Sequence, residues 1–326
     1  MKDIALITGC YGQDGSYLAE LLTKKGYEVH GICRERLSEN SSRIRKELGL
    51  KNVKVVEHYE SIYDYTSIKN LIGRLKPAIL FHTAARHYSS EKRENSELYT
   101  NKILYDDNVL ATGNILCGCK KASDKTHVMI SGSCLMYDNS GSDRQSENMP
   151  YMSRSMYGTA KIAEAGLAQY YRNEGLFVSV AILYNHESHR RSKSFVTQKI
   201  ANGLMEIKEG KRERLVLADL GTKKDWGFAG DYVRGMYLML MAEKPGDYIF
   251  SSGNLHTIRD YVEECARQLS LDDWEKYVIC DGTIVTRKIH GELFGDNEKA
   301  VRNLGWRQEY GFSDLVNDMI TGGRQL

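Results

Sequence analysis

The chain has 326 residues, enough for two hydrophobic cores or for one large domain carrying a smaller lobe. Its composition, 41 % hydrophobic and 27 % charged, is ordinary for a globular protein and argues against intrinsic disorder. The formal net charge of +2 gives no reason to expect nucleic acid or an anionic membrane as the main partner.

No segment of the sequence predicts export or membrane insertion. The first nine residues become polar too quickly for a signal peptide. No run approaches the roughly 18–20 apolar residues that cross a bilayer. The seven cysteines are scattered without a secretory context, so we interpret them as reduced thiols. Cys117 and Cys119 lack a second Cys or His pair at ligand spacing, and we expect no structural metal. These features predict a cytoplasmic protein.

Through the first half of the chain, short apolar runs alternate with longer amphipathic stretches. The predicted strands are residues 4–8, 28–32, 53–57, 78–83, 128–131 and 177–183. The predicted helices between them are residues 16–25, 66–75, 108–119 and 157–173. This alternation is typical of an α/β fold with a doubly wound parallel sheet of the Rossmann type.

The alternation breaks after Asn185, where a basic run occupies residues 189–193. We interpret this run either as a loop at a ligand or subunit interface, or as a solvated charged segment. Further helices are predicted around 195–209 and after 225–233. We predict a Rossmann domain over residues 1–184, with 225–252 packing back on it. A smaller α/β substrate-binding lobe is predicted from residues 185–224 and 253–326.

The first predicted strand leads directly into the sequence Gly-Cys-Tyr-Gly-Gln-Asp-Gly at residues 9–15. Glycines let the backbone turn sharply and approach a pyrophosphate, and the free N–H groups at the following helix start attract its charge. A strand before the glycines and a helix after them are the context that this chemistry requires. We therefore predict dinucleotide-binding residues at Gly9, Gly12, Gln13, Asp14 and Gly15.

The end of the second predicted strand indicates which dinucleotide binds. NAD enzymes usually place an acidic residue there for the ribose hydroxyls, whereas NADP enzymes place arginine for the 2′-phosphate. Here Arg34 and Arg36 follow the strand, with Asn40 and Arg43 beyond them. Because guanidinium groups form paired hydrogen bonds with phosphate, we expect NADP as the cofactor. The alternative is a solvated charged loop, which the acidic Glu35 between the two arginines favours.

Tyr157 and Lys161 are four residues apart and therefore share one face of a predicted helix. The ammonium, together with the positive charge of a nicotinamide, is expected to lower the pKa of the tyrosine toward neutrality. Such a phenol exchanges a proton with an oxygen while hydride moves at the adjoining carbon. Ser133 follows an apolar strand about two dozen residues earlier, where its hydroxyl can bind the same oxygen. We predict Ser133, Tyr157 and Lys161 as the catalytic residues.

These motifs resemble those of the GDP-mannose 4,6-dehydratases, members of the extended short-chain dehydrogenases. The resemblance runs over nearly the full length and is carried by GQDGSYLAE (12–20), KGYEVHGI (25–32), RSMYG (154–158), NHES (185–188), FVTQKI (195–200) and KDWG (224–227). It implies NADP held by Arg34, Asn40 and Arg43, with further cofactor contacts at Ala84 and His186. It also implies a homodimer or homotetramer with a GDP-linked sugar pocket that includes Asn185, Val196, Lys199, Lys224 and Arg287.

One departure from that family bears on the reaction. In the dehydratases, the segment at the active-site hydroxyl reads T-S-E-L-Y-G, and its glutamate removes the C5 proton and helps to expel the C6 hydroxyl. Here the segment reads S-C-L-M-Y-D from Ser133, so Leu135 stands at the position of the glutamate. A lost general base usually costs on the order of 10²–10⁴ in rate. GDP-fucose synthases, which are distant relatives, use a cysteine for epimerisation in this region, and Cys134 lies one residue from its position. Because a shift of one residue along a strand turns the side chain to the other face, we expect Cys134 to be a packed thiol that faces away from the site.

The retained and the missing residues together predict NADP-dependent hydride transfer at C4 of a GDP-linked 6-deoxy sugar, most simply by a 4-ketoreductase. Two alternatives are left open. One is a 4,6-dehydratase or epimerase that uses an atypical base such as His87 or Glu187. The other is a non-catalytic paralogue that binds a GDP-sugar, although the three retained catalytic residues argue against it.

Overall fold

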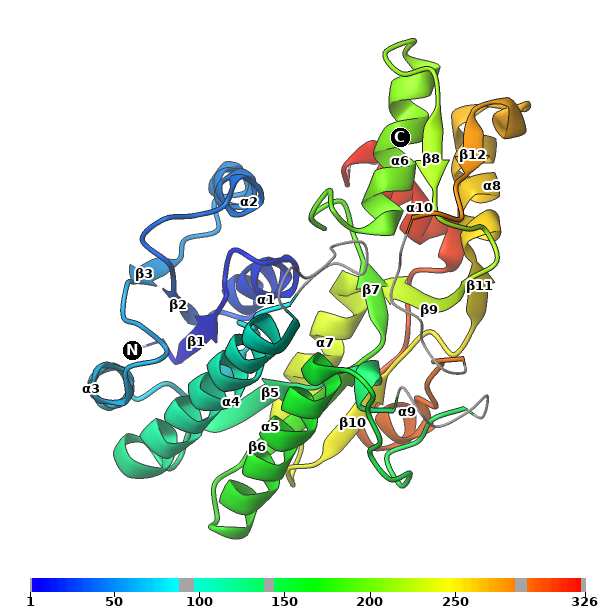
Figure 1. Ribbon diagram of the computed structural model, residues 1–326. Helices are drawn as coiled ribbons and strands as arrows, with labels where there is room; N and C mark the ends of the chain where they lie inside the picture. Colours follow the sequence, from blue (N-terminus) through cyan, green and yellow to red (C-terminus); the bar gives the residue numbers. More distant parts are fainter. Residues whose placement is uncertain (1, 88–96, 138–143, 285–291, 324–326) are drawn as a thin grey trace.

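A seven-stranded parallel sheet forms the larger part of the computed structural model, which describes residues 2–87, 97–137, 144–284 and 292–323 (Figure 1). The strand order is β10-β6-β5-β4-β1-β2-β3. The strands are β1 (Ile4–Thr8), β2 (Glu28–Ile32), β3 (Val56–His58), β4 (Ile79–His82), β5 (His127–Ser131), β6 (Val178–Leu183) and β10 (Asp247–Phe250). This order is that of a doubly wound Rossmann sheet, so the predicted fold class is confirmed.

Helices cover both faces of the sheet (Figure 1). On one face, α4 (Glu97–Ala122) packs between α3 (Tyr65–Leu75) and α5 (Met156–Asn173). On the other face, α1 (Gln13–Lys24) packs against α7 (Ala229–Leu240). This double cover explains why the central strands are continuous apolar runs rather than alternating ones. None of the described helices is both long and apolar enough to cross a membrane.

The structure differs most from the predicted elements at the edge of the sheet, around β3 and the helix that precedes it. β3 is three residues long and lies at the edge, where Val56 is exposed. The helix before it, α2 (Glu39–Leu50), is absent from the predicted elements. It buries only Ile44 and Leu48, so it presents almost no apolar face. It begins instead with a polar cap, in which the Ser38 side chain accepts a hydrogen bond from the backbone N–H of Ser41.

A second hydrophobic core lies beyond the carboxyl ends of the sheet, between α6 (Val196–Lys208), α8 (Ile258–Leu269) and α10 (Phe312–Thr321). Two small sheets border it, made of β7 (Asn185–Glu187), β9 (Lys223–Phe228) and β11 (Leu255–Thr257), and of β8 (Leu215–Leu217) and β12 (Val278–Cys280). Residues of α7, β10 and α9 (Glu298–Leu304), with Trp306, belong to the larger core. Because a single residue separates β6 from β7, the chain passes directly from the large sheet into this lobe.

Candidate active site

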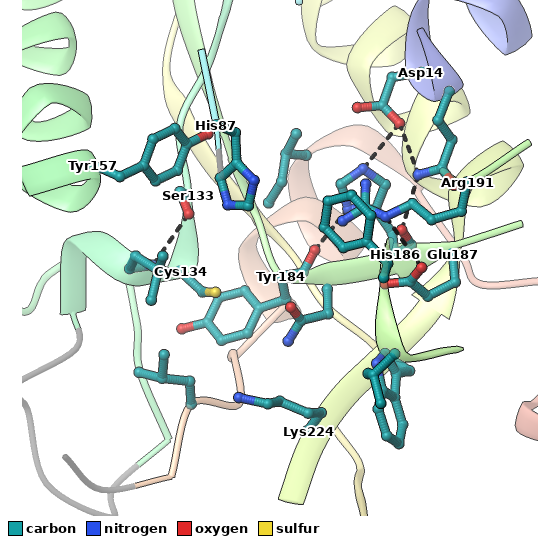
Figure 2. Close-up of a pocket in the computed structure, with 18 of the residues that line it drawn as sticks. Asp14, His87, Ser133, Cys134, Tyr157, Tyr184, His186, Glu187, Arg191 and Lys224 are labelled. Atoms are coloured by element: carbon teal, nitrogen blue, oxygen red, sulfur yellow. Dashed lines mark hydrogen bonds and ion pairs between the residues drawn. The ribbon is translucent and has the colours of Figure 1, made fainter. Parts of the chain in front are cut away.

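A cavity of about 400 Å³ lies where the carboxyl ends of β1, β5 and β6 face the smaller lobe (Figure 2). A second cavity of about 530 Å³ adjoins it beside the ends of β2 and β3, and Gly9, Gly12, Thr83 and Ala85 line both. Ligands of doubly wound proteins bind at this edge of the sheet. We refer to them as the substrate cavity and the cofactor cavity.

The turn after β1 has the geometry of a phosphate-binding turn. Gly9 has a φ of +74°, and a β-carbon there would lie 3.1 Å from the backbone of Ala84, so both conformation and space require glycine. The Gly12 N–H donates to the Gly9 carbonyl at 2.8 Å and closes the turn. No side chain caps the start of α1, which leaves its first N–H groups available to an anion. The predicted residues Gly9, Gly12, Gln13, Asp14 and Gly15 line the substrate cavity, and Ala84 lines the cofactor cavity.

The three residues predicted for the 2′-phosphate do not lie together. Arg34 follows β2 and lines the cofactor cavity with Arg36. Asn40 and Arg43 lie on α2 and are not among the residues that line it. Their side chains donate to backbone carbonyls of the loop after β7, Asn40 at 3.2 Å and Arg43 at 3.1 Å. In this conformation they hold the loop, and Arg34 is the member of the set that faces the cofactor cavity.

Ser133 lies in the turn after β5, just before a short 3₁₀ helix, η1 (Cys134–Tyr137). Its hydroxyl oxygen accepts a hydrogen bond from the Leu135 N–H at 3.2 Å. The hydroxyl hydrogen therefore remains available for donation to a substrate oxygen. Ser133 lines the substrate cavity, as the sequence predicts for a group that binds the reacting oxygen.

The expectation that Cys134 faces away from the site is wrong. Its side chain is only 6 % exposed, but it lies on the wall of the substrate cavity, as does Leu135 (Figure 2). The expectation assumed a strand, in which a shift of one residue reverses the side-chain direction. In the 3₁₀ turn, successive side chains are separated by about a third of a turn, so the two residues that follow Ser133 can border one cavity.

Tyr157 is positioned by the first turn of α5. The Ser155 side chain caps this helix by accepting a hydrogen bond from the Gly158 N–H at 3.0 Å. A β-carbon on Gly158 would lie 2.2 Å from the Leu135 carbonyl oxygen, so the glycine allows α5 to begin directly against η1. This contact places Tyr157 in the substrate cavity together with Ser133 (Figure 2).

Lys161 lies one helical turn after Tyr157 and is almost completely buried. Its Nζ is 5.7 Å from the centroid of the Tyr157 ring and 3.0 Å from Glu164 Oε2. The same carboxylate oxygen accepts a hydrogen bond from Thr112 at 2.9 Å. Glu164 is as buried as the lysine, and its Oε1 has no hydrogen-bond partner among the described residues. The ammonium is thus held between the phenol and a buried carboxylate.

The protein groups around Tyr157 do not by themselves lower the pKa of its phenol; the predicted lowering also relies on the positive charge of a nicotinamide and stays a prediction. Burial raises the pKa of the phenol, and the opposing effect of Lys161 is smaller. The Glu164 carboxylate offsets part of the lysine charge and raises the pKa of Tyr157 further. For Lys161, burial lowers the pKa, but Glu164 and Tyr157 outweigh it and keep the ammonium charged. The site therefore favours a protonated phenol, the form that donates a proton.

His186 joins the phosphate-binding turn to the smaller lobe. Its Nδ1 donates to the Tyr184 carbonyl at 2.7 Å, and its Nε2 lies 2.9 Å from Asp14 Oδ1. Burial lowers the pKa of His186, but the Asp14 carboxylate outweighs burial and raises it overall. Gln13 adds a hydrogen bond to the His186 carbonyl at 2.9 Å and accepts one from Ser188 at 2.9 Å. The residue predicted to lie near the nicotinamide therefore lines the substrate cavity on a tightly fixed segment.

The residues predicted for the GDP-sugar pocket are only partly brought together. Asn185, Val196 and Lys224 line the substrate cavity, and Figure 2 shows the Lys224 side chain extending into it from β9. Lys199 lies in the first turn of α6 but is not among the residues that line the cavity. Arg287 falls outside the described residues.

The basic run after β7 is not a solvated segment. Arg190 is fully buried and forms ion pairs with Glu20 and, at 2.6 Å, with Glu47, while its guanidinium lies 4.2 Å from the centroid of the Tyr17 ring. Arg191 lines the substrate cavity, pairs with Glu187 at 3.2 Å and lies over the Phe195 ring. Of the two interpretations of this run, a loop at a ligand site agrees with the position of Arg191.

Comparison of the sequence with known families agrees with this geometry. The family model described as GDP-mannose 4,6 dehydratase matches residues 6–319. The chain belongs to the GDP-mannose 4,6-dehydratase family. It is 36 % identical to GDP-mannose 4,6 dehydratase 2 of Arabidopsis thaliana, over 100 % of this chain and 88 % of that protein. It is 32 % identical to the GDP-mannose 4,6 dehydratase of Drosophila melanogaster, over 99 % of this chain and 86 % of that protein. The resemblance inferred from the sequence motifs is confirmed.

Solved structures of more distant proteins share the fold of this family member. The dTDP-glucose 4,6-dehydratase of Bacillus anthracis, in complex with NAD, has a TM-score of 0.81 at 18 % identity and covers 98 % of this chain and 96 % of its own. RMD from Pseudomonas aeruginosa, complexed with NADPH, has a TM-score of 0.77 at 18 % identity and covers 98 % of both chains. The shared fold therefore extends over nearly the whole chain.

Two residues of the site, Glu164 and Tyr184, are not among the predicted residues. Glu164 is three residues after Lys161, a spacing that places both on one helical face, so the pair could have been found from the sequence. Tyr184 lines the substrate cavity and donates a hydrogen bond to Gln145 at 2.9 Å. It continues the apolar run of β6, and nothing in that pattern separates a residue of the cavity wall from a residue of the core.

Proposed function

We propose that this member of the family catalyses NADP-dependent hydride transfer at C4 of a GDP-linked sugar. The observation that carries the proposal is the grouping of Ser133 and Tyr157 in one cavity with Lys161 buried behind them. That cavity lies between the phosphate-binding turn and the smaller lobe. The relatives that match over nearly their full length are named for GDP-mannose, which supports a GDP-linked sugar as the substrate.

The cofactor residues fit a nicotinamide dinucleotide. The turn at Gly9 and the uncapped start of α1 suit a pyrophosphate, and the cofactor cavity continues from them to Arg34. The similar folds include one protein complexed with NAD and one with NADPH, and Arg34 is the reason to favour NADP here. When bound, the nicotinamide supplies or accepts the hydride at C4.

The residues of this chain control the oxygen on that carbon. Ser133 donates a hydrogen bond to the C4 oxygen and holds it at the cavity wall. Tyr157 gives its proton to this oxygen during reduction and takes it back during oxidation. Lys161 stays charged through its pair with Glu164 and stabilises the phenolate that forms when the proton leaves.

Leu135 favours reduction of a 4-keto-6-deoxy sugar over dehydration. It lines the substrate cavity two residues after Ser133, at the position where the related dehydratases have a glutamate that removes the C5 proton. An alkyl side chain cannot accept that proton.

A 4,6-dehydratase is the second candidate, and the names of the full-length relatives favour it. Of the two atypical bases, Glu187 is buried and engaged, since its carboxylate pairs with Arg191 and accepts a hydrogen bond from Thr197 at 2.9 Å. The His87 ring lines the substrate cavity in edge contact with Tyr157, with 4.7 Å between ring centroids. His87 is therefore the residue that a dehydratase mechanism would use.

One pair of incubations separates these functions. The protein is mixed with GDP-mannose and NADP, and separately with the GDP-4-keto-6-deoxy sugar and NADPH, while nicotinamide absorbance and sugar mass are followed. NADPH consumption with a gain of two hydrogens in the second mixture supports the reductase. Loss of water from GDP-mannose overturns the reductase in favour of the dehydratase. Binding without turnover in both mixtures overturns both and identifies a non-catalytic GDP-sugar-binding protein.

Replacement of Arg34 with alanine should weaken the binding of NADPH but not of NADH. A hydrogen bond to a charged group contributes about 1.5–3 kcal/mol, so the Kd for NADPH should rise roughly 10- to 150-fold. Nicotinamide fluorescence titration measures both constants. Arg302→Ala, an exposed arginine on α9, is the matched control and should change neither. Equal losses for both dinucleotides would contradict a 2′-phosphate contact.

Replacement of Leu135 with glutamate should introduce elimination of water from GDP-mannose. The new carboxylate would stand at the position of the base in the related dehydratases, and a general base contributes on the order of 10²–10⁴ in rate. The product is detected by its loss of the mass of one water. Leu135→Gln has the same shape without a base and should remain inactive. Equal elimination by both variants would show that the carboxylate is not responsible.

A further inference from the structure

Two cysteines outside the catalytic group lie against each other at the cofactor cavity. Cys10 is the second residue of the phosphate-binding turn, and Cys33 directly follows β2. β1 and β2 are adjacent parallel strands whose last residues, Thr8 and Ile32, are paired. This register brings the two thiols together at the carboxyl edge of the sheet, with 3.3 Å between the sulfur atoms.

Both thiols are buried by the protein on one side and border the cofactor cavity on the other. Cys10 is 1 % exposed and Cys33 is 8 % exposed, and both line that cavity. The Cys10 sulfur occupies the space above Gly31, where a β-carbon would lie only 2.5 Å from it. The sulfur therefore has little room to move away from Cys33.

The two thiols differ in their acid–base properties. The hydrogen bond from Cys10 lowers the pKa of Cys33, against the effect of burial, and the guanidinium of Arg45 lowers it as well, while Glu57 opposes them. The same bond and burial raise the pKa of Cys10. Because the thiolate is the reactive form of cysteine and Cys33 is the more exposed of the two, we assign Cys33 as the nucleophile and Cys10 as the partner that can resolve its oxidised form.

We propose that Cys10 and Cys33 form a reversible disulfide that controls access of the dinucleotide to its site. The oxidant is a peroxide. The Cys33 thiolate attacks one peroxide oxygen, which breaks the O–O bond, yields a sulfenic acid and releases hydroxide. The Cys10 thiol then attacks the Cys33 sulfur and expels the hydroxyl as water. Two thiols are oxidised to one disulfide, and one hydrogen peroxide is reduced to two waters. A dithiol reductant reverses the change.

The disulfide should weaken dinucleotide binding because the turn has little freedom to adjust. Closing the sulfur–sulfur distance from 3.3 Å to about 2.05 Å moves the Cys10 side chain toward Cys33. The adjoining Gly9 is already confined by its positive φ and by the backbone of Ala84. A bound dinucleotide, in turn, covers both thiols and should slow their oxidation, since a ligand that binds only the reduced form stabilises it. This inference rests on the proposed dinucleotide site but not on the sugar chemistry.

The test uses the full-length protein and two independent readouts. The reduced protein is first titrated with NADPH and NADH by nicotinamide fluorescence, which establishes that the dinucleotide binds. It is then treated with hydrogen peroxide, digested without reduction, and examined by mass spectrometry for a peptide pair that joins Cys10 to Cys33. We expect the linked peptides, at least a tenfold loss of dinucleotide affinity, recovery with dithiothreitol, and slower linkage when the preferred dinucleotide is present.

Two variants define the result. Cys33→Ala should form no link and should keep its own dinucleotide affinity after peroxide. Cys280→Ser, which removes an exposed thiol on β12, should respond as the unaltered protein does. Absence of the Cys10–Cys33 link, or a complete link with unchanged affinity, would overturn the proposal. Failure of the reduced protein to bind either dinucleotide would instead refute the proposed cofactor, and the mass measurement would still report on the disulfide.

Discussion

Tyr157→Phe should abolish turnover and leave the fold intact. The change removes only the phenolic oxygen, and the ring keeps its edge contact with His87. Without the hydroxyl, no group in this position can give a proton to the C4 oxygen. Loss of a positioned acid or base costs on the order of 10²–10⁴ in rate. The measurement is kcat for nicotinamide oxidation with the GDP-4-keto sugar, together with the dinucleotide Kd, which should not change.

A tyrosine on the same helix provides the control for this substitution. Tyr170 lies on α5, is 58 % exposed, and is remote from the cavity lining. Tyr170→Phe should retain the turnover of the unaltered protein. If Tyr157→Phe also retained it, the acid would have to be another group, and His87 would be the next residue to replace.

Glu164→Ala should destabilise the protein strongly, by about 3–5 kcal/mol, because it leaves the buried Lys161 ammonium without its counterion. The measurement is the free energy of unfolding from urea denaturation at neutral pH. Glu263→Ala is the surface control. It breaks an exposed pair with Arg259, whose charged atoms are 3.8 Å apart, and it should cost less than about 1 kcal/mol.

A double variant distinguishes the loss of the pair from a general packing defect. Lys161→Met with Glu164→Leu removes both charges and fills the space with apolar groups, so its stability should exceed that of Glu164→Ala. If the double variant were instead less stable than Glu164→Ala, the lost packing and not the unpaired charge would explain the effect.

The same carboxylate should leave a signature in the pH dependence of turnover. Glu164 raises the pKa of Tyr157, so Glu164→Gln should lower it and shift the limb of the profile that reports the phenol to lower pH. A purely structural role for Glu164 would reduce activity without moving that limb.

The sequence predicts best those helices and strands whose hydrophobic pattern follows from burial in the core. β1 and β2 coincide with the predicted strands, and in each of them every residue after the first is buried. The missed α2 has two buried residues and takes its start from the Ser38 cap. The helix predicted over 108–119 is the inner part of α4, Glu97–Ala122, whose outer turns carry polar residues. Helices and edges held by polar contacts leave a weaker periodicity than those held by the core.

The candidate site likewise contains some features that the sequence pattern predicts and others that it does not. The glycine turn and the Tyr157–Lys161 pair depend on local spacing, which is visible in the sequence. The wall position of Cys134 depends on a 3₁₀ turn, and the raised pKa of Tyr157 depends on burial beside Glu164. The 3₁₀ turn is a local backbone conformation that the residue pattern does not reveal, and the burial of Tyr157 depends on how α5 packs against the rest of the protein. For Cys134, the residue spacing predicted the opposite placement.

The contacts between the phosphate-binding turn and the start of β7 bear on how a dinucleotide and a sugar would be positioned relative to each other. Gln13 and Asp14 bind the backbone and ring of His186, and Tyr17 packs against both hydrophobic cores. These contacts fasten the proposed dinucleotide site to the proposed sugar site among the described residues, so we expect the two sites to keep a fixed relative position. A single residue of the cavity wall could then change without moving one reactant relative to the other. We expect Leu135 to be such a residue, whose exchange alters the reaction but not the alignment of dinucleotide and sugar.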